Sequence, residues 1–182
     1  MDQSKEIEDL TVKALIKICT PKQQDYHANI YKLIGMIQKK KMHTIYISTT
    51  RCLSDIEKEL KGSGLKGPIH FVDTLSKKLM RNVPVENCYF VDSPADLNGI
   101  VTGFTAMKKE CDEKGEKSVI VFDNINNLML DNEQPTVLRF LYNFFCRIRA
   151  MNIPALIVFL ADEKESKTLD LLESIADGDL EI

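Results

Sequence analysis

Six short apolar runs constrain the fold of this chain more than any other feature. They are residues 12–19, 44–47, 69–72, 88–91, 119–122 and 155–160. Unbroken runs of this length are typical of parallel strands that are covered on both faces. Stretches with helical spacing and one apolar stripe lie between them, at residues 30–37, 97–111 and 137–148. This alternation predicts an α/β fold, a three-layer sandwich with a mostly parallel sheet and helices on both faces.

The length of the chain predicts a single domain. At 182 residues it is barely longer than one typical domain, and no repeat or low-complexity linker interrupts the pattern. We interpret residues 1–11 as an amino-terminal lead segment and residues 12–182 as the domain. The net charge of -3 gives no overall field that favours nucleic acid or an anionic membrane.

The composition is that expected of a cytoplasmic protein. No run approaches the ~18 apolar residues of a membrane span, and the first ten residues lack the apolar core of a signal peptide. The five cysteines are spread singly, which argues against both a disulfide framework and a thiolate zinc site. His27, His43 and His70 show no metal-ligand spacing, so we interpret them as ordinary histidines. We therefore expect a reducing environment.

Several residues are candidates for helix ends. Ser93 followed by Pro94 is typical of an N-cap and a first-turn proline, and Ser54 is a second N-cap candidate. Gly62 and Gly115 lie where helices are expected to end. In open α/β sheets, ligands bind at the carboxyl ends of the strands, so the candidate functional residues are sought there.

The turn after the first strand is where a nucleotide-binding α/β protein would have its P-loop. A P-loop needs glycines, whose amides converge on phosphate oxygens, and a lysine at the start of the helix. Residues 19–27 contain no glycine, and Asp25, as an N-cap, would fill the anion site with its own carboxylate. We therefore interpret this turn as structural. The residues at this degenerate P-loop position are Thr20, Pro21, Lys22, Asp25, Tyr26 and His27.

The strand at residues 118–123 has the shape of a Walker B segment. It is apolar and ends in Asp123, a carboxylate that could hold a magnesium-bound water. Alternatively, Asp123 caps the turn at residues 124–127. Asp73, Asp92 and Asp162 also follow strands, so these carboxylates form either an acidic rim that binds a divalent cation or a set of ordinary turn caps.

Three passages resemble RecA-fold ATPases of the KaiC and RadA kind, in particular a degenerate, archaeal-type member. The longest is residues 118–130, followed by 136–141 and the strand at 153–160; it is similar to the family's Walker B strand, loop, next helix and next strand. The other two are the aspartate-glycine turn and strand at 175–182 and the strand-to-helix turn at 91–97. The resemblance covers residues 12–182 and implies a RecA-like fold without a functional P-loop.

The chain departs from this family at the residues that bind and hydrolyse ATP. Tyr26 and His27 stand where active members have the lysine and the serine or threonine of the P-loop. Residues 49–51, Thr-Thr-Arg, stand where a pair of glutamates activates water, and these side chains offer no general base at neutral pH. Only Asp123 carries over, as a vestigial Walker B residue.

The resemblance therefore implies a catalytically inactive RecA/KaiC-like domain, a regulatory or scaffolding module that acts through protein contacts in a homo- or hetero-oligomer. On this interpretation no cofactor is expected. The alternative is an ATP-binding protein with a non-standard phosphate loop, weak or no ATPase activity, Lys22 or Arg51 as the anion contact and Mg²⁺ at Asp123. DNA binding is disfavoured because the loops at residues 131–133 and 162–165 are acidic.

Overall fold

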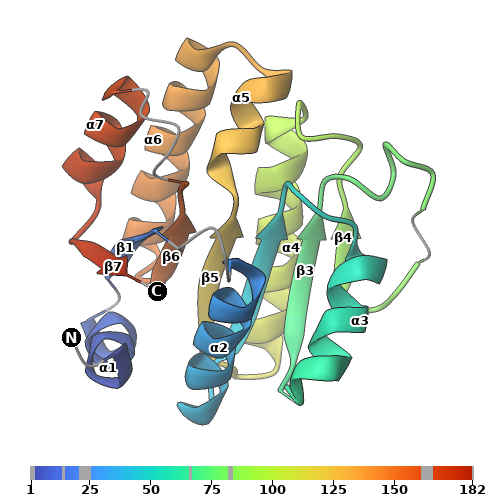
Figure 1. Ribbon diagram of the computed structural model, residues 1–182, viewed down its shortest axis with the longest axis vertical. Coiled ribbons are helices and arrows are strands. Elements are labelled where there is room, and N and C mark those ends of the chain that lie inside the picture. Colours follow the sequence, from blue (N-terminus) through green and yellow to red (C-terminus); the bar gives the residue numbers. More distant parts are fainter. Residues whose placement is uncertain are drawn as a thin grey trace.

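One parallel sheet runs through the centre of the protein (Figure 1). The computed structural model describes residues 3–13, 15–20, 26–65, 67–81, 84–160 and 166–181. In these residues the strand order is β4-β3-β2-β5-β6-β1-β7, and all neighbouring strands are parallel. The strands are β1 (Ile16–Thr20), β2 (His43–Ser48), β3 (Ile69–Asp73), β4 (Cys88–Phe90), β5 (Ser118–Asp123), β6 (Ala155–Val158) and β7 (Asp179–Glu181).

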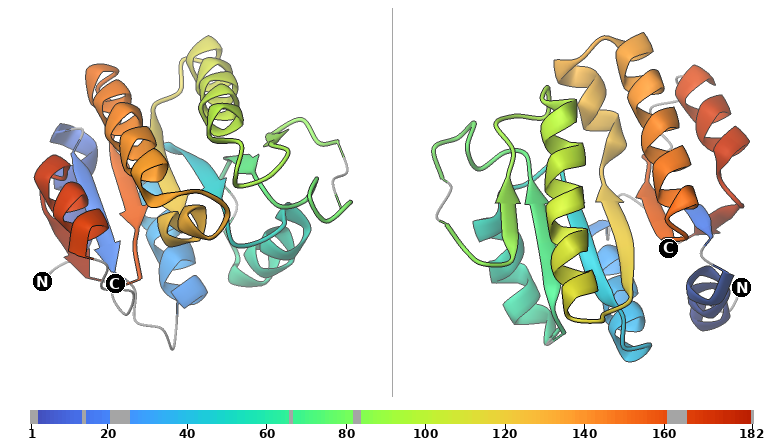
Figure 2. Two further views of the ribbon diagram at one scale, coloured as in Figure 1. Left: turned by 90° about the horizontal axis from the view of Figure 1, so that it is seen from above. Right: turned by 180° about the vertical axis from the view of Figure 1, so that it is seen from behind.

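Helices cover both faces of the sheet (Figure 2). The first face packs against α1 (Gln3–Lys13), α2 (Tyr26–Lys39) and α3 (Leu53–Ser63), and the second against α4 (Leu97–Glu113), α6 (Gln134–Ala150) and α7 (Ser166–Ile175). The 3-10 helix η2 (Ile125–Asn127) and the short α5 (Leu128–Asp131) follow β5. The predicted three-layer α/β sandwich is confirmed, and it is compatible with a RecA-like arrangement. None of the described helices is long and apolar enough to cross a membrane.

The central strands are buried on both sides, as their unbroken apolar sequences predict. All six residues of β5 are buried. Along β2, Ile45 and Ile47 belong to the core beneath α4, whereas Tyr46 belongs to the core beneath α2. Successive side chains of a strand point to opposite faces, and this alternation decides which residues of β2 reach which side of the sheet.

The first apolar run differs from its prediction. The sequence predicts one strand over residues 12–19, but α1 continues to Lys13 and β1 begins only at Ile16. Ile7 and Leu10 are buried in the first-face core, while Val12 is 77% exposed. Residues three apart share a helix face, so the side of α1 that holds Ile7 and Leu10 turns Val12 outward. The predicted boundary between residues 1–11 and 12–182 falls within α1.

The start of α4 lies later than predicted. Asp96, not Ser93, is its N-cap, and the Asp96 side chain accepts a hydrogen bond of 2.8 Å from the amide of Gly99. Ser93 belongs to the preceding turn, in which the amide of Asp96 donates to the carbonyl of Ser93 at 3.0 Å. Both residue types are good N-caps, and the turn at Ser93 delays the helix by three residues.

The ends of α3 also differ from the prediction. Ser54 lies inside α3, because Cys52 takes the N-cap position. Gly64, not Gly62, ends the helix, with a φ of 74° that favours glycine. After α4, in contrast, Gly115 has a φ of 70° and ends the helix as predicted.

Candidate functional site

The carboxyl ends of the strands lie at one edge of the sheet, close to the start of α2 (Figure 1). Thr20 is the last residue of β1, and Tyr26 and His27 are the first two residues of α2. Pro21, Lys22 and Asp25, predicted at the same turn, lie outside the described residues, so their roles stay predictions. The described part of the site is therefore built around Asp123, at the end of β5.

Asp123 is buried, and both of its carboxyl oxygens accept hydrogen bonds from tyrosines. The hydroxyl of Tyr26 donates to Oδ1, and the hydroxyl of Tyr46 donates to Oδ2. The Asp123 main-chain carbonyl accepts from the amide of Thr49 at 2.8 Å, and the peptide bond to Asn124 is cis. Asp123 thereby joins α2, β2 and β5.

Burial dominates the electrostatics of this carboxyl group. It raises the pKa of Asp123 from its ordinary value of 3.8 to about 8. Nearby, burial and the Asp123 charge together raise the pKa of the Cys19 thiol to about 12. Burial therefore favours the neutral, protonated form of this carboxyl group. Mg²⁺ is bound by ionised carboxylates, so a magnesium ion at Asp123 would have to overcome the cost of ionising a buried group.

Asp123 does not cap the turn that follows it, which was one of the two sequence interpretations. Asn124 does so instead: its side-chain Oδ1 accepts a hydrogen bond of 2.9 Å from the amide of Asn126 at the start of η2. The Asp123 side chain points away from this turn because both of its oxygens are held by the tyrosines. The turn-cap interpretation of Asp123 is therefore wrong.

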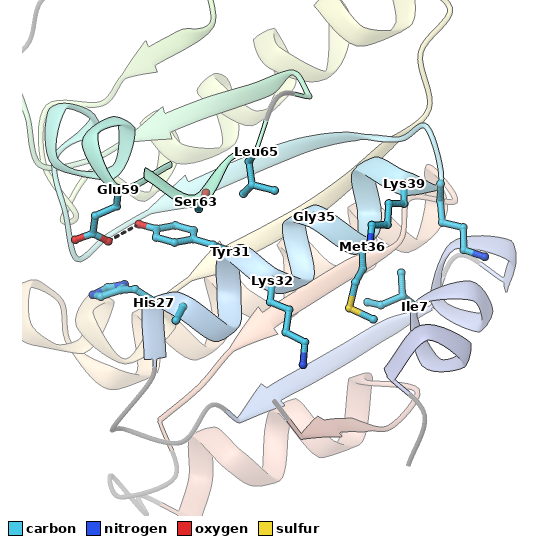
Figure 3. A pocket seen from close by; sticks show the side chains of 12 residues that line it. Ile7, His27, Tyr31, Lys32, Gly35, Met36, Lys39, Glu59, Ser63 and Leu65 are labelled. Carbon is cyan, nitrogen blue, oxygen red and sulfur yellow. Dashed lines mark hydrogen bonds between the residues drawn. The ribbon is translucent and has the colours of Figure 1, made fainter. Parts of the chain in front are cut away.

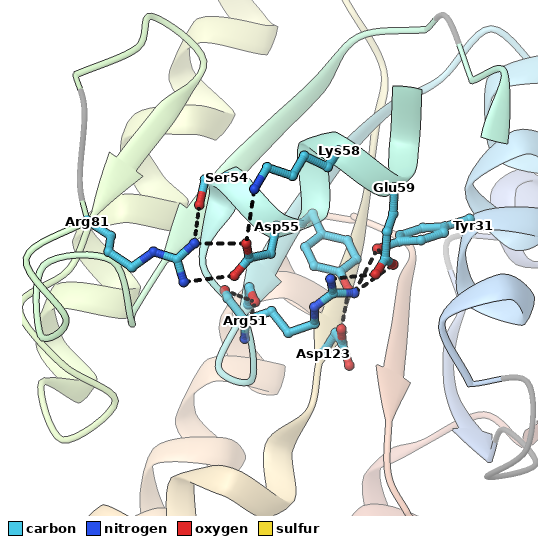
Figure 4. Close-up of polar contacts among 10 residues, drawn as sticks. Tyr31, Arg51, Ser54, Asp55, Lys58, Glu59, Arg81 and Asp123 are labelled. Carbon is cyan, nitrogen blue, oxygen red and sulfur yellow. Dashed lines mark hydrogen bonds and ion pairs between the residues drawn. The ribbon is translucent and has the colours of Figure 1, made fainter. Parts of the chain in front are cut away.

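Arg51, the predicted anion contact, is engaged by a carboxylate (Figure 4). Its guanidinium donates two hydrogen bonds of 2.7 Å to the two carboxylate oxygens of Glu59 and a third of 3.3 Å to the hydroxyl of Tyr31. The bond from Arg51 lowers the pKa of Glu59 and keeps it ionised. His27 stacks on Tyr31 with ring centroids 6.3 Å apart, and burial lowers its pKa. A phosphate at Arg51 would compete with Glu59 for the guanidinium.

The acidic residues after the other strands are divided between caps and surface. Asp73 accepts hydrogen bonds from the amides of Leu75 and Ser76 at 2.8 Å and from the amide of Leu53, at the start of α3, at 2.7 Å. This carboxylate is an ordinary cap that joins β3 to α3. Asp92 is exposed and pairs with Lys77 at 2.9 Å. Asp162 lies outside the described residues.

A groove on the outer side of α2 was not predicted. It has a volume of about 820 Å³ and lies between α1 and α3. Figure 3 shows Tyr31, Gly35, Met36 and Leu65 along it, with Glu59 at one end, Lys39 toward the other and Lys32 between them. A Cβ atom at position 35 would lie 3.0 Å from Cδ2 of Leu65, so a glycine at this position lets the Leu65 side chain approach the backbone of α2 closely. An interior glycine in a helical pattern is the sequence signal for such a close approach.

Comparisons with known proteins show the fold and no family. No protein-family model matches the sequence, and no curated protein matches it. Among solved structures, the chain is similar to an uncharacterized protein from Pyrococcus horikoshii, whose crystal structure is of a complex with an unknown peptide. The two share 12% sequence identity, the match covers 97% of this chain and 82% of that one, and the TM-score is 0.72. At this identity the likeness concerns the fold alone.

Proposed function

We propose that this chain is a catalytically inactive RecA/KaiC-like domain that acts through protein contacts as a regulatory or scaffolding module. The contact between Tyr26 and Asp123 is the observation that supports this proposal most. Tyr26 begins α2, where the resemblance implies the phosphate-binding lysine, and its hydroxyl meets the one Walker B residue that carries over. A phenol in this place provides no positive charge for a triphosphate.

The chemistry around Asp123 also argues against hydrolysis of ATP. Phosphoryl transfer needs a metal ion on the phosphates and a residue that orients the attacking water. Burial raises the pKa of Asp123 to about 8, and both of its oxygens already accept hydrogen bonds from tyrosine hydroxyls. Thr49, at the position of the family's glutamates, donates its hydroxyl to the carbonyl of Asn124. The Thr49 side chain therefore offers no general base to an attacking water.

The groove on α2 is our candidate surface for a protein partner. Its walls include the apolar side chains of Ile7, Met36 and Leu65, and Lys32, Lys39 and Lys40 also line it. An extended peptide with an apolar side chain above Gly35 and an acidic residue facing the lysines complements this lining. The solved structure of similar fold was determined with a peptide, which is a precedent for peptide binding on a fold of this kind.

The ATPase part of the proposal is tested with purified chain, Mg²⁺ and ATP. We expect no turnover and no calorimetric heat of binding at millimolar ATP or ADP. Turnover that is lost in Asp123→Ala would overturn the proposal. A heat of binding without turnover, lost in Arg51→Ala, would favour the alternative of an ATP-binding protein with a non-standard phosphate loop.

The peptide part is tested by selecting peptides on the immobilised chain from a random library and measuring their affinity by fluorescence anisotropy. We expect acidic peptides with an apolar residue, and an affinity at least ~10-fold lower for Met36→Glu, because a new carboxylate would repel the acidic residue and remove apolar contact. Met80→Glu is the matched control, since Met80 is 94% exposed outside the groove. Equal affinity in the two variants would exclude the groove.

A further inference from the structure

Two histidines and a cysteine meet at the edge of the sheet opposite to Asp123. His43 is the first residue of β2, His70 is the second residue of β3, and Cys111 lies near the end of α4. Their possible metal-ligand atoms all lie within 4.8 Å of one another. His70 and Cys111 are fully buried, and His43 is half-buried.

The register of the sheet explains why these residues meet. His70 pairs with Ile45, and His43 precedes Ile45 by two residues on the same strand. Both histidines therefore point to the side of the sheet that α4 covers, as Ile45 does. Cys111 belongs to the apolar stripe by which α4 packs on this face. The three side chains thus converge from three buried elements.

The distances are close to those of a coordinated metal ion. Sγ of Cys111 lies 3.7 Å from Nδ1 of His70. Nitrogen and sulfur ligands of a tetrahedral zinc ion, at about 2.1 and 2.3 Å from the metal, lie about 3.6 Å apart. The ring centroids of His43 and His70 are 5.9 Å apart, and the three possible ligand atoms lie within 4.8 Å of one another, so they would draw together by about 1 Å to share one zinc ion.

Two carboxylates stand behind the histidines. Oε2 of Glu116 lies 2.8 Å from Nδ1 of His43, and Oε2 of Glu110 lies 3.5 Å from Nε2 of His70. Nδ1 of His43 and Oε2 of Glu116 are both buried, and they face each other at this short distance. A carboxylate beside the outer nitrogen of a metal-binding histidine fixes the orientation of the ring, and Glu116 is placed to do this for His43.

We propose that His43, His70 and Cys111 bind a zinc ion, with Glu116 beside them balancing its charge. Imidazole and thiolate are the ligands that zinc prefers, whereas magnesium and calcium prefer oxygen. A cysteine thiolate and the Glu116 carboxylate together neutralise the two positive charges of the ion. A hydrogen bond between the thiol and His70 accounts for that contact alone, whereas a zinc ion accounts for the convergence of all three possible ligand atoms.

Bound zinc would fasten the beginnings of β2 and β3 to the end of α4. Burial lowers the pKa of His70, which favours the neutral imidazole that metals need. Burial also raises the pKa of the Cys111 thiol to about 11, so binding has to release its proton. The ion would add stability to a part of the fold that is separate from the groove and from Asp123. Zinc binding at this site therefore does not depend on whether a nucleotide or a peptide is bound elsewhere on the protein.

The test begins with the full chain, stripped of metal by a chelator and titrated with zinc chloride in a calorimeter. We expect one ion per chain, with a dissociation constant of about 1 µM or tighter, since structural zinc binds strongly. Cobalt(II) as a probe should give the visible bands of a tetrahedral site and a thiolate charge-transfer band in the near ultraviolet. The absence of stoichiometric zinc binding would overturn the proposal.

Variants then assign the ligands. We expect His70→Ala and Cys111→Ala to weaken zinc binding by more than ~100-fold, and Glu116→Gln by about 10- to 100-fold, the loss typical of residues outside the first ligand shell. His27→Ala and the exposed Cys146→Ala are matched controls and should bind as the wild type does. If His70→Ala does not fold, the charge-transfer band in the wild type and its loss in Cys111→Ala decide the question.

Two outcomes would refute the zinc site: zinc binding that survives Cys111→Ala, and zinc binding that is equally lost in Cys146→Ala. Unchanged affinity for zinc in Glu116→Gln would refute the role of that carboxylate.

Discussion

The hydroxyl of Tyr26 is hydrogen-bonded to the carboxyl group of Asp123, across 97 residues of sequence. The bond joins the first residue of α2 to the last residue of β5, so it spans the place where a nucleotide-binding α/β protein of this layout would hold phosphate and magnesium. In this protein the bond fastens α2 to the sheet. The stability of the protein and the dependence of that stability on pH should both reflect this bond.

Removal of the Tyr26 hydroxyl should destabilise the protein. Tyr26→Phe leaves Oδ1 of buried Asp123 without its donor, and we expect a loss of about 1 to 3 kcal/mol in the free energy of unfolding, measured in urea. Tyr142→Phe is the matched control, because Tyr142 is 52% exposed and should change the stability by less than ~0.5 kcal/mol. Equal effects in the two variants would show that the bond to Asp123 contributes nothing.

The raised pKa of Asp123 predicts a stability that falls with pH. The carboxyl titrates near 3.8 when it is unperturbed, as in the unfolded chain, and near 8 in the fold, so folding takes up a proton between these values. Its contribution is fully present below the lower pKa and is lost as the pH rises through the higher one, by at most ~1.4 kcal/mol per pH unit.

Asp123→Asn should remove this contribution, because an amide does not titrate. Urea unfolding of both proteins at a series of pH values between 5 and 9 gives the difference in their free energies of unfolding. We expect the wild type to lose stability relative to Asp123→Asn as the pH rises to about 8, the pKa in the fold, and the difference to level off above it. A difference that does not change with pH would show that Asp123 is ionised throughout.

The ion pair of Arg51 and Glu59 should add little to stability despite its good geometry. The side chain of Glu59 is 44% exposed, and solvent screens such pairs. We expect a coupling energy of about 0.5 to 1 kcal/mol from the cycle of Arg51→Ala, Glu59→Ala and the double variant, measured by urea unfolding. A coupling of several kcal/mol would mean that Arg51 is a central support of this edge of the sheet.

Alanine should have opposite effects at two helical glycines. In α4, a Cβ at Gly103 would lie 2.7 Å from Cδ1 of Tyr89 and 2.9 Å from Cγ1 of Val72, so Gly103→Ala should destabilise by about 1 to 3 kcal/mol. In α3, Gly62 has open space around it, and Gly62→Ala should stabilise by up to ~1 kcal/mol because alanine favours the helix. Thermal unfolding of both variants checks the two signs. A stable Gly103→Ala would show that α4 can move off the sheet without cost.

The layers of the fold could be predicted because buried parallel strands have a distinctive sequence. The run at residues 119–122 has no polar residue to mark an exposed face, and β5 is indeed buried throughout. The prediction of one strand over residues 12–19 was wrong because this run joins the last residues of α1 to β1, with no helix-breaking residue between them. Periodicity cannot separate a short apolar strand from the end of a helix in such a case.

The candidate site could be predicted only in part. A helix after β1 follows from the alternation of strands and helices, although α2 begins at Tyr26, before the helical spacing at residues 30–37, and the end of β5 at Asp123 follows from its apolar run. The contribution of Tyr46 could not be predicted, because an interior strand tyrosine reads as core and its hydroxyl reaches Asp123 only through the register of β2 and β5. The meeting of His70 with Cys111 depends in the same way on the packing of α4, which no local spacing records.

The place of β1 within the sheet has a consequence for synthesis on the ribosome. Ile16 pairs with Ala155 and Ile18 with Asp179, so the first strand to be made lies between the last two. The backbone groups of β1 stay unpaired until β6 and β7 have been made, and an unpaired strand of this kind readily joins other chains. The sheet is therefore completed only when β6 and β7 pair with β1. Nascent chains that stall before β6 are the species most exposed to aggregation.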